Sequence, residues 1–303
     1  MKSRNSVYSE SSTYAFIKSI TVPSLRPTFI KCIYLILYNF FFRQHRAAFL
    51  PGRIPVSDVD HPLDEKIPFV PSWVVIYFDF IHLWIRMLSF FLRRYGRKFF
   101  KLAGEFIVSI GKLYAFAAEV YQKNLSTTKR PFYIKNLKFF IIHLNDPHLM
   151  CVPSLHVMVV IHTYTKFAEY AKKMGERDNL IEQFLEVKYG AQFITQAILF
   201  IKQHSVNCIP AALYAMTCYT PDLFPLEEAE NFTQLLFTPL PENCKAPKGS
   251  VVHPASAPKT ALPKEDQDEI KAHILKLYRK FLEEGKTAKN WNDPLLNFLA
   301  SYR

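Results

Sequence analysis

Glycine is scarce in this 303-residue chain, and cysteine pairs are missing. Only 8 residues are glycine, well under the usual share of about 7%, so glycine-rich phosphate loops of the Rossmann and P-loop kinds are not expected. The five cysteines form no CxxC pair, which argues against a cysteine zinc site and a disulfide framework. Acidic residues are outnumbered as well, with 26 Asp and Glu against 38 Lys and Arg, a formal net charge of +12.

Aromatic and aliphatic residues are abundant, and they are unevenly distributed. Long apolar runs occupy residues 29–219, whereas residues 220–303 are polar and interrupted by prolines. We therefore predict an N-terminal polar tail (1–28), a membrane domain (29–219) and a soluble C-terminal extension (220–303). Many basic residues flank the apolar runs, where anionic lipid headgroups are their natural counter-charge, so the net charge does not indicate nucleic acid.

The apolar runs predict an all-α, polytopic six-helix membrane bundle. The first run, Phe29–Phe42, has 14 residues and would cover roughly 21 Å of a hydrocarbon core about 30 Å thick. We favour a short span there over an interfacial helix. Charges within the next two runs are expected to face the bundle interior or the interface. The remaining candidates are residues 73–92, 99–120, 154–170, 184–201 and 206–219, whereas 137–144 is too short to span.

The extension carries one helical pattern. Between Asp266 and Glu284, apolar residues recur on a broad stripe, which predicts an amphipathic helix. We expect it to pack on the protein or the membrane surface, and a dedicated partner-binding helix is the alternative.

Polar chemistry gathers at three ends of the apolar runs. The first place is Lys123 to Arg130-Pro131, the second is Pro153-Ser154-Leu155-His156, and the third is Lys202-Gln203-His204. Each has an ordinary interpretation, as interfacial anchors, a helix cap or a polar turn. However, all three emerge on one side of the bundle, opposite the basic stretches 93–98 and 172–177, which the positive-inside rule places in the cytoplasm.

These residue types suit an anion. The planar fork of Arg130 binds phosphate bidentately, and a lysine adds a point charge. Ser154 stands where an N-cap belongs, and a helix N-terminus there offers free N–H groups to an anion. We therefore predict an anion site on the outer face.

The pattern resembles the type 2 phosphatidic acid phosphatase family. Its KxxxxxxRP motif is matched by Lys123, Arg130 and Pro131, and its PSxH motif by Pro153, Ser154 and His156. The third motif is matched only at His204, where the KQH sequence is similar to the inositol phosphorylceramide synthase branch. The resemblance covers roughly residues 60–219 and implies a multi-pass protein whose active site faces the outside, the lumen or the periplasm.

The resemblance also implies roles. His204 would be the nucleophile that forms a phosphohistidine, and His156 would be the general acid. Phosphoryl oxygens would be held by Lys123, Arg130 and Ser154, without a metal or cofactor. The partner would be a membrane lipid phosphate, and the oligomeric state is left open.

The third motif departs from the family. Its arginine falls on Ile198 and its aspartate on Cys208. Lys202 is the candidate to replace the arginine. For the aspartate, which orients the histidine ring, Asp146 and Asn207 are the candidate substitutes.

Three hypotheses follow. The first is a phosphatase or phosphotransferase acting on lipid phosphate esters; the second is a degenerate relative that binds anionic headgroups without turnover. The third is an unrelated channel, transporter or scaffold, in which Lys123, Arg130, His156 and His204 would lie far apart. A metal site from His143, Asp146, His148 and His156 fits no known spacing and is not expected.

Overall fold

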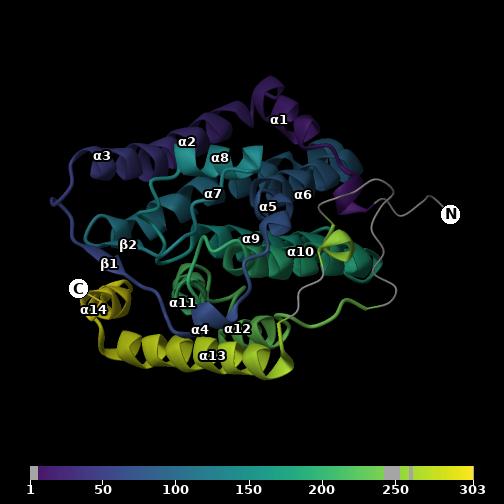
Figure 1. Cartoon of the computed structure of the whole chain (residues 1–303). Coiled ribbons are helices and arrows are strands. Elements are labelled where there is room, and N and C mark those ends of the chain that lie inside the picture. The colour runs from purple at the N-terminus through teal and green to yellow at the C-terminus, as the bar shows by residue number, and fades with distance from the viewer. Residues whose placement is uncertain (1–5, 242–252, 259–261, 303) are drawn as a thin grey trace.

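The computed structural model describes residues 6–241, 253–258 and 262–302, and it is built almost entirely of helices (Figure 1). Helix accounts for 70% of it and strand for 2%, which confirms the all-α class. The α-helices are α1 (Ser12–Thr21), α2 (Arg26–Ile36), α3 (Arg43–Phe49), α4 (Leu63–Lys66), α5 (Val74–Tyr77), α6 (Asp79–Tyr95), α7 (Phe100–Tyr121), α8 (Leu137–Asn145), α9 (Leu155–Lys173), α10 (Ile181–Phe200), α11 (Cys208–Tyr219), α12 (Leu226–Gln234), α13 (Lys264–Thr287) and α14 (Asp293–Ala300). Shorter elements are the 3₁₀ turns η1 (Val7–Ser9), η3 (Pro71–Trp73), η4 (Gly96–Phe99), η5 (Asp178–Leu180) and η6 (Pro254–Ser256), the π-helical η2 (Leu37–Phe42), and the strands β1 (Val56–Asp58) and β2 (Leu125–Thr127).

The N-terminal helices form one outer layer, at the top of Figure 1. Helices α2, η2 and α3 join into one long helix, which meets α1 at an angle of 115°. This helix packs along α7 in the same direction. A Cβ on Gly111 of α7 would lie 3.0 Å from the Cα of Cys32, so a glycine allows this close approach.

Helix α9 is the central element of the core, because it packs against α6, α7, α10 and α11. Its side chains from Val157 to Thr165 are all buried. Beside it, Arg86 donates to the carboxylate of Asp79 at 2.6 Å, and both side chains are buried. This pair confirms that the charges of the second apolar run face inward.

The charges of the third apolar run do not face the interior, which leaves the interface as the predicted alternative. Lys101, Glu105 and Lys112 of α7 are exposed at the surface. They are spaced four and seven residues apart, and thus lie along one face of the helix.

A small parallel sheet, absent from the sequence prediction, connects distant segments. Val56 pairs with Leu125 and Asp58 with Thr127, and Ser126 also bridges to Met150. The sheet therefore fixes the loops on either side of Arg130 against the segment that precedes α4.

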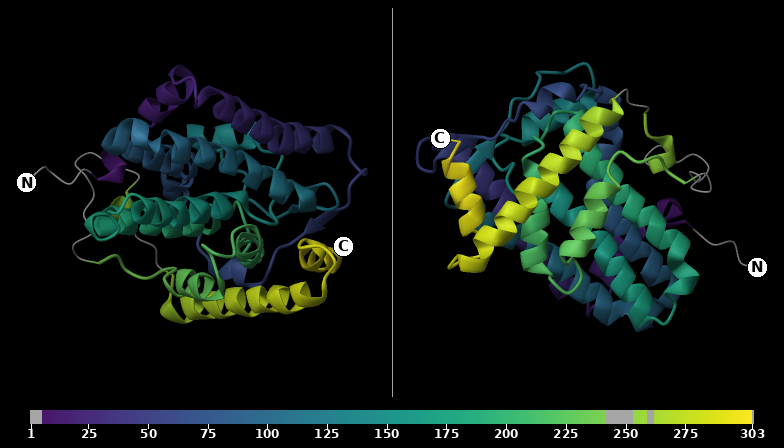
Figure 2. Two further views of the ribbon diagram at one scale, coloured as in Figure 1. Left: turned by 180° about the vertical axis from the view of Figure 1, so that it is seen from behind. Right: turned by 90° about the horizontal axis from the view of Figure 1, so that it is seen from below.

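The described part of the C-terminal extension packs on the helical core (Figure 2). The predicted amphipathic helix is α13, which buries Ile274, Tyr278 and Phe281 and packs mainly against α11. Packing on the protein, one of the two expected locations, is thus confirmed for this helix.

One helical stretch, Pro71–Tyr121, is long and apolar enough to cross a membrane. A second would qualify if α1 and the helix Arg26–Phe49 formed one broken span. Helix α11 is apolar but has only 12 residues. Six spans therefore stay a prediction, while the helical class is established.

Candidate functional site

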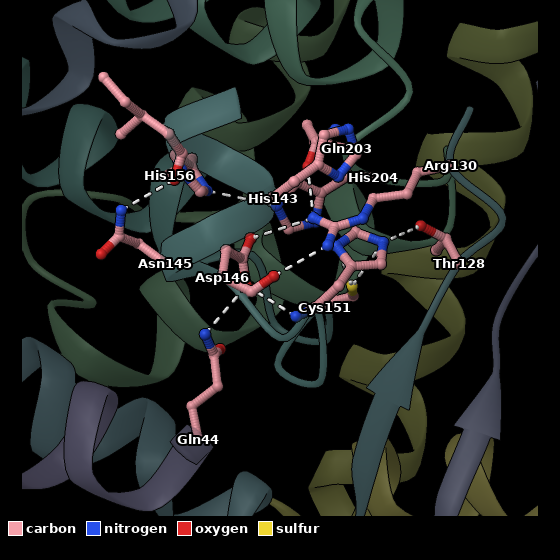
Figure 3. A network of polar contacts seen from close by, with 12 residues as sticks. Gln44, Thr128, Arg130, His143, Asn145, Asp146, Cys151, His156, Gln203 and His204 are labelled. Atoms are coloured by element: carbon pink, nitrogen blue, oxygen red, sulfur yellow. Dashed lines mark hydrogen bonds and ion pairs between the residues drawn. The ribbon is translucent and has the colours of Figure 1, made fainter. Parts of the chain in front are cut away.

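Two histidines from separate parts of the chain meet at the start of α9. His156 lies in the first turn of α9, and His204 lies in the loop between α10 and α11. The Nε2 atom of His204 is 3.2 Å from Nδ1 of His156. The structure thus brings together the two residues to which the sequence assigned chemistry (Figure 3).

Ser154 joins this pair. It occupies the N-cap position of α9, as predicted, but its side chain caps no backbone N–H. Its hydroxyl instead lies 3.4 Å from Nε2 of His204. The Ser154 side chain therefore contacts His204 instead of capping the helix.

Arg130 reaches the same place from the loop after β2. One guanidinium nitrogen donates to Oε1 of Gln203 at 3.2 Å, and the other donates to the backbone carbonyl of Asp146 at 2.9 Å. Figure 3 shows this guanidinium between Asp146 and Gln203. Because Gln203 precedes His204, the arginine lies next to the histidine loop.

Asp146 is tied to Arg130 and not to the histidines. Its Oδ2 atom is 3.9 Å from the Arg130 guanidinium, and its Oδ1 atom accepts from Gln44 and from the backbone N–H of His148. The proposal that Asp146 replaces the missing motif aspartate beside His204 is therefore wrong.

Lys202 lies beside Arg130, in a groove at the protein surface. Its backbone has φ +56°, and its Nζ atom donates to the backbone carbonyl of Asp64. Burial lowers the pKa of Lys202, and the nearby Asp64 opposes that effect. Lys202 and Arg130 line one groove of about 830 Å³, which also contains Lys129.

Lys123 is the one predicted site residue that the structure does not bring to this group. Its Nζ atom contacts Oδ1 of Asn292 at 3.5 Å. It lines a different surface hollow, together with Glu119 and Trp291. The helix end that carries Lys123 is covered by the C-terminal segment, which the motif spacing could not reveal.

His204 is held as a neutral ring. Burial lowers its pKa to about 3, with His148 adding to the effect, while the nearby backbone of Cys151 partly offsets it. Its Nδ1 atom is buried and makes no hydrogen bond within the described residues. This is the nitrogen that an orienting carboxylate would meet.

Asn207 does not take that place either. Its side-chain amide donates to the backbone carbonyl of Val59 and the hydroxyl of Tyr302, and its oxygen lies 2.8 Å from Nε2 of His273. Asn207 therefore fastens α13 and the C-terminus to the start of α11. Cys208, at the position of the family aspartate, is fully buried.

Two polar residues of the site were given no role from the sequence. Gln203 binds Arg130, and the carboxylate of Asp64 accepts the backbone N–H of Val206 at 2.8 Å and so holds the histidine loop. Asp64 belongs to an acidic connector (58–65) that carries no family motif. The one sequence signal for Asp64 is the cluster of carboxylates in this connector.

Comparisons with family models, with curated proteins and with solved structures find no match for this chain. Among the described residues, no three His, Cys, Asp or Glu side chains are grouped so that they could hold a metal ion.

Proposed function

We propose that this protein cleaves a lipid phosphate ester by transferring the phosphoryl group to His204. The observation that carries the proposal is the contact between His204 and His156, 3.2 Å apart, with Ser154 and Arg130 beside them. The third hypothesis, an unrelated channel, transporter or scaffold, predicts that Lys123, Arg130, His156 and His204 lie far apart. The grouping of the last three counts against it, whereas Lys123 does lie apart. Lys123 is left out of the proposed machinery.

In the proposed reaction, Nε2 of His204 attacks phosphorus and the ester P–O bond breaks. Burial lowers the pKa of His156 to about 3, so its ring is neutral until an anionic ester binds beside it and favours the imidazolium form. The imidazolium gives its extra proton to the departing alcohol oxygen and becomes neutral. Water then attacks phosphorus, the P–N bond breaks, His156 takes a proton from the attacking water, and phosphate is released. If a lipid alcohol attacks in place of water, the same site is a phosphotransferase.

The negative charge of the transferred phosphoryl group would be stabilised by cationic side chains. Arg130 presents a planar fork whose partners, Gln203 and the Asp146 carbonyl, fix its orientation. Ser154 and Lys202 would complete the contacts to the phosphoryl oxygens. Phosphoryl transfer depends mostly on positioning and on such fixed charges.

The second hypothesis, a headgroup-binding protein without turnover, rests on a different observation. The buried Nδ1 of His204 has no hydrogen-bond acceptor among the described residues. The ring then favours a proton on Nε2, facing Nδ1 of His156, and a protonated Nε2 cannot attack phosphorus. An unoriented nucleophile of this kind can cost on the order of 10⁴ in rate.

The six-span arrangement is predicted from the apolar runs, and the outward-facing site from the order of those runs and from the family resemblance. The reaction needs neither, because it requires only that the site meets lipid. The chemistry is therefore tested first.

The test measures phosphate release from phosphatidic acid and related lipid phosphates by the full chain in detergent, beside His204→Ala. Release that is lost in the variant supports the enzyme. A lipid alcohol acceptor is added in parallel, so that a transferase does not appear silent.

Cys208→Asp separates the two hypotheses, and Cys208→Asn is its uncharged control. An enzyme limited by its missing carboxylate gains activity in the aspartate variant alone. A site without turnover stays inactive in both variants, while binding of the lipid phosphate to His204→Ala and wild type remains comparable.

A further inference from the structure

The exposed large apolar side chains of the described residues are concentrated in two segments. Outside 16–56 and 132–144 there are only three of them, at Ile81, Ile181 and Leu226. Within the two segments they are Phe16, Ile17, Ile20, Ile30, Ile33, Tyr34, Leu37, Tyr38, Phe41, Phe42, Phe49, Leu50, Val56, Phe132, Ile134, Leu137, Phe140, Ile141 and Leu144. An apolar surface of this extent indicates a binding partner.

These side chains form stripes on helices that lie on one side of the molecule. In α8, exposed residues recur from Leu137 to Leu144 at helical spacing, and the α2–η2 helix repeats the pattern from Ile30 to Phe42. Figure 1 shows α1, α2 and α3 along the upper edge and α8 directly below α2. Gln44 of α3 bonds to Asp146, directly after α8, at 2.9 Å, so the two segments adjoin. We call the exposed apolar side chains of α1–α3 and α8 the lipid-docking face.

The charges of this face have one sign. Residues 11–57 contain no Asp or Glu but six Lys or Arg, and residues 129–145 contain four Lys or Arg and again no acid. Arg26, Lys31, Arg46 and Lys135 are exposed. Apolar stripes with cations at their margins match a bilayer containing anionic lipid. A second copy of the same face would instead oppose like charges.

The orientation of the face follows from α7. The helix α2 packs along α7, and α7 exposes Lys101, Glu105 and Lys112. If α2 crossed a bilayer, this charged stripe would run through the hydrocarbon beside it, which is costly. An α2 lying in the plane of the interface leaves the charges in water.

We propose that the protein binds the membrane through the lipid-docking face, with α1–α3 and α8 in the plane of the interface and the remaining helices outside the hydrocarbon. Arg130 is two positions from Phe132, an 80% exposed side chain in the loop that leads into α8. The face would thus hold the site next to lipid headgroups. The proposal concerns membrane contact and stands apart from whether His204 turns over substrate.

The first test is flotation of the full chain with phosphatidylcholine vesicles, with and without phosphatidylglycerol. Leu37→Asp combined with Leu137→Asp places two charges on the face, at side chains 52% and 72% exposed. We expect vesicle binding to weaken by about tenfold or more. The control, Ile181→Asp with Leu226→Asp, changes two apolar residues elsewhere that are 49% and 45% exposed, and it should bind as the wild type does.

The second test distinguishes docking from spanning. Lys112→Cys and Lys280→Cys are placed separately in a Cys218→Ser, Cys244→Ser background, in which Cys32, Cys151 and Cys208 are buried. The vesicle-bound protein is treated with a membrane-impermeant maleimide, and we expect equal labelling at both positions. Protection at Lys112 alone would mean that α7 lies in the bilayer and would overturn the proposal.

A third outcome would also overturn it. If the chain dimerises in solution, if the face variants abolish the dimer, and if no vesicles bind, then the face is covered by a second copy. None of these measurements depends on phosphate release, so a failure of the proposed reaction would leave their interpretation unchanged.

Discussion

The Nε2 atom of His204 lies 3.2 Å from Nδ1 of His156, although 48 positions separate the two residues. The contact requires the loop after α10 to fold back over the start of α9, and hydrogen bonds to Asp64 hold that loop in place. One ring must donate and the other accept in this contact. A neutral His204 ring with an unprotonated Nε2 is what a nucleophile needs, whereas His156 has to take up a proton, as an anionic ester binds, before it can act as the acid.

His156→Gln should slow the release of phosphate from a lipid ester by about 10²–10⁴, the usual range for loss of a general acid. The alkoxide leaving group needs a proton, whereas the leaving group of p-nitrophenyl phosphate does not. The same variant should therefore lose much less activity on p-nitrophenyl phosphate. Steady-state rates on the two substrates provide the measurement.

The control for this variant is His82→Gln, because His82 is exposed and its ring lies 3.2 Å from the Ser12 hydroxyl, away from the proposed site. It should leave both rates unchanged. An equal loss on both substrates in His156→Gln would show that His156 has a structural role instead.

The positions of some site residues could be predicted from the sequence, whereas others depend on contacts with residues far along the chain. Ser154 and His156 lie at the start of α9 and His204 follows α10, and the order of the apolar runs predicted only that these places emerge on one side. The side chain of Lys123 is long, and its direction is set by Asn292, which is 169 positions away. A motif specifies a residue type and a spacing, but it carries no information about such a distant contact.

The face of each helix that is exposed to solvent was equally hard to predict from the sequence. The third apolar run has the hydropathy of a membrane span, yet α7 exposes Lys101, Glu105 and Lys112. Average hydropathy does not record which face of a helix its charges occupy, and burial of the opposite face accounts for most of its apolar residues. The β1–β2 pairing joins segments of three residues each, too short for a periodic pattern to mark.

Arg130→Lys should weaken the binding of inorganic phosphate, measured as a competitive inhibition constant, by about tenfold or more. The lysine keeps the charge but loses the planar fork that bonds both Gln203 and the Asp146 carbonyl. Asp146→Asn tests the neighbouring carboxylate. Its Oδ2 atom lies 3.9 Å from the arginine, and a pair of that kind is worth at most about 1 kcal/mol.

We therefore expect Asp146→Asn to change the inhibition constant only a few-fold, since the asparagine oxygen still accepts from Gln44. The reverse order of effects would contradict the assignment of Arg130 to the anion. It would point to Asp146 as the residue that organises the site.

The stability of the protein should fall as the pH drops below about 6.5. Burial lowers the pKa of His204 and of His148 from 6.5 to about 3, with the charge of Arg130 adding to the effect at His148. Between these values each of these two rings binds a proton in the unfolded chain but not in the folded chain, and the same holds for His156 and His162, whose pKa burial also lowers to about 3. His204 and His148 together decrease the free energy of unfolding by up to about 2.7 kcal/mol for each pH unit, the other two rings add to this slope, and the loss is absent above pH 6.5.

His148→Gln isolates one of these groups. Urea unfolding at a series of pH values should give a slope that is smaller by about 1.4 kcal/mol per pH unit than in the wild type. An unchanged slope would mean that His148 is already protonated in the folded protein.

The packing of α2 on α7 can be tested at two glycines of the same helix. A Cβ on Gly111 would lie 3.0 Å from the Cα of Cys32 and from Cδ1 of Leu35, whereas a Cβ on Gly104 would be 3.5 Å from its nearest atom, Cγ2 of Thr28.

Gly104→Ala should stabilise the protein by up to about 1 kcal/mol, because alanine favours the helix. Gly111→Ala forces the backbones apart and should destabilise it by about 1–3 kcal/mol. Thermal unfolding of the two variants supplies the comparison, and equal stabilities would mean that α2 is not held closely against α7. Because the lipid-docking face is carried largely by α2, Gly111→Ala should also weaken vesicle binding, while Gly104→Ala leaves it intact.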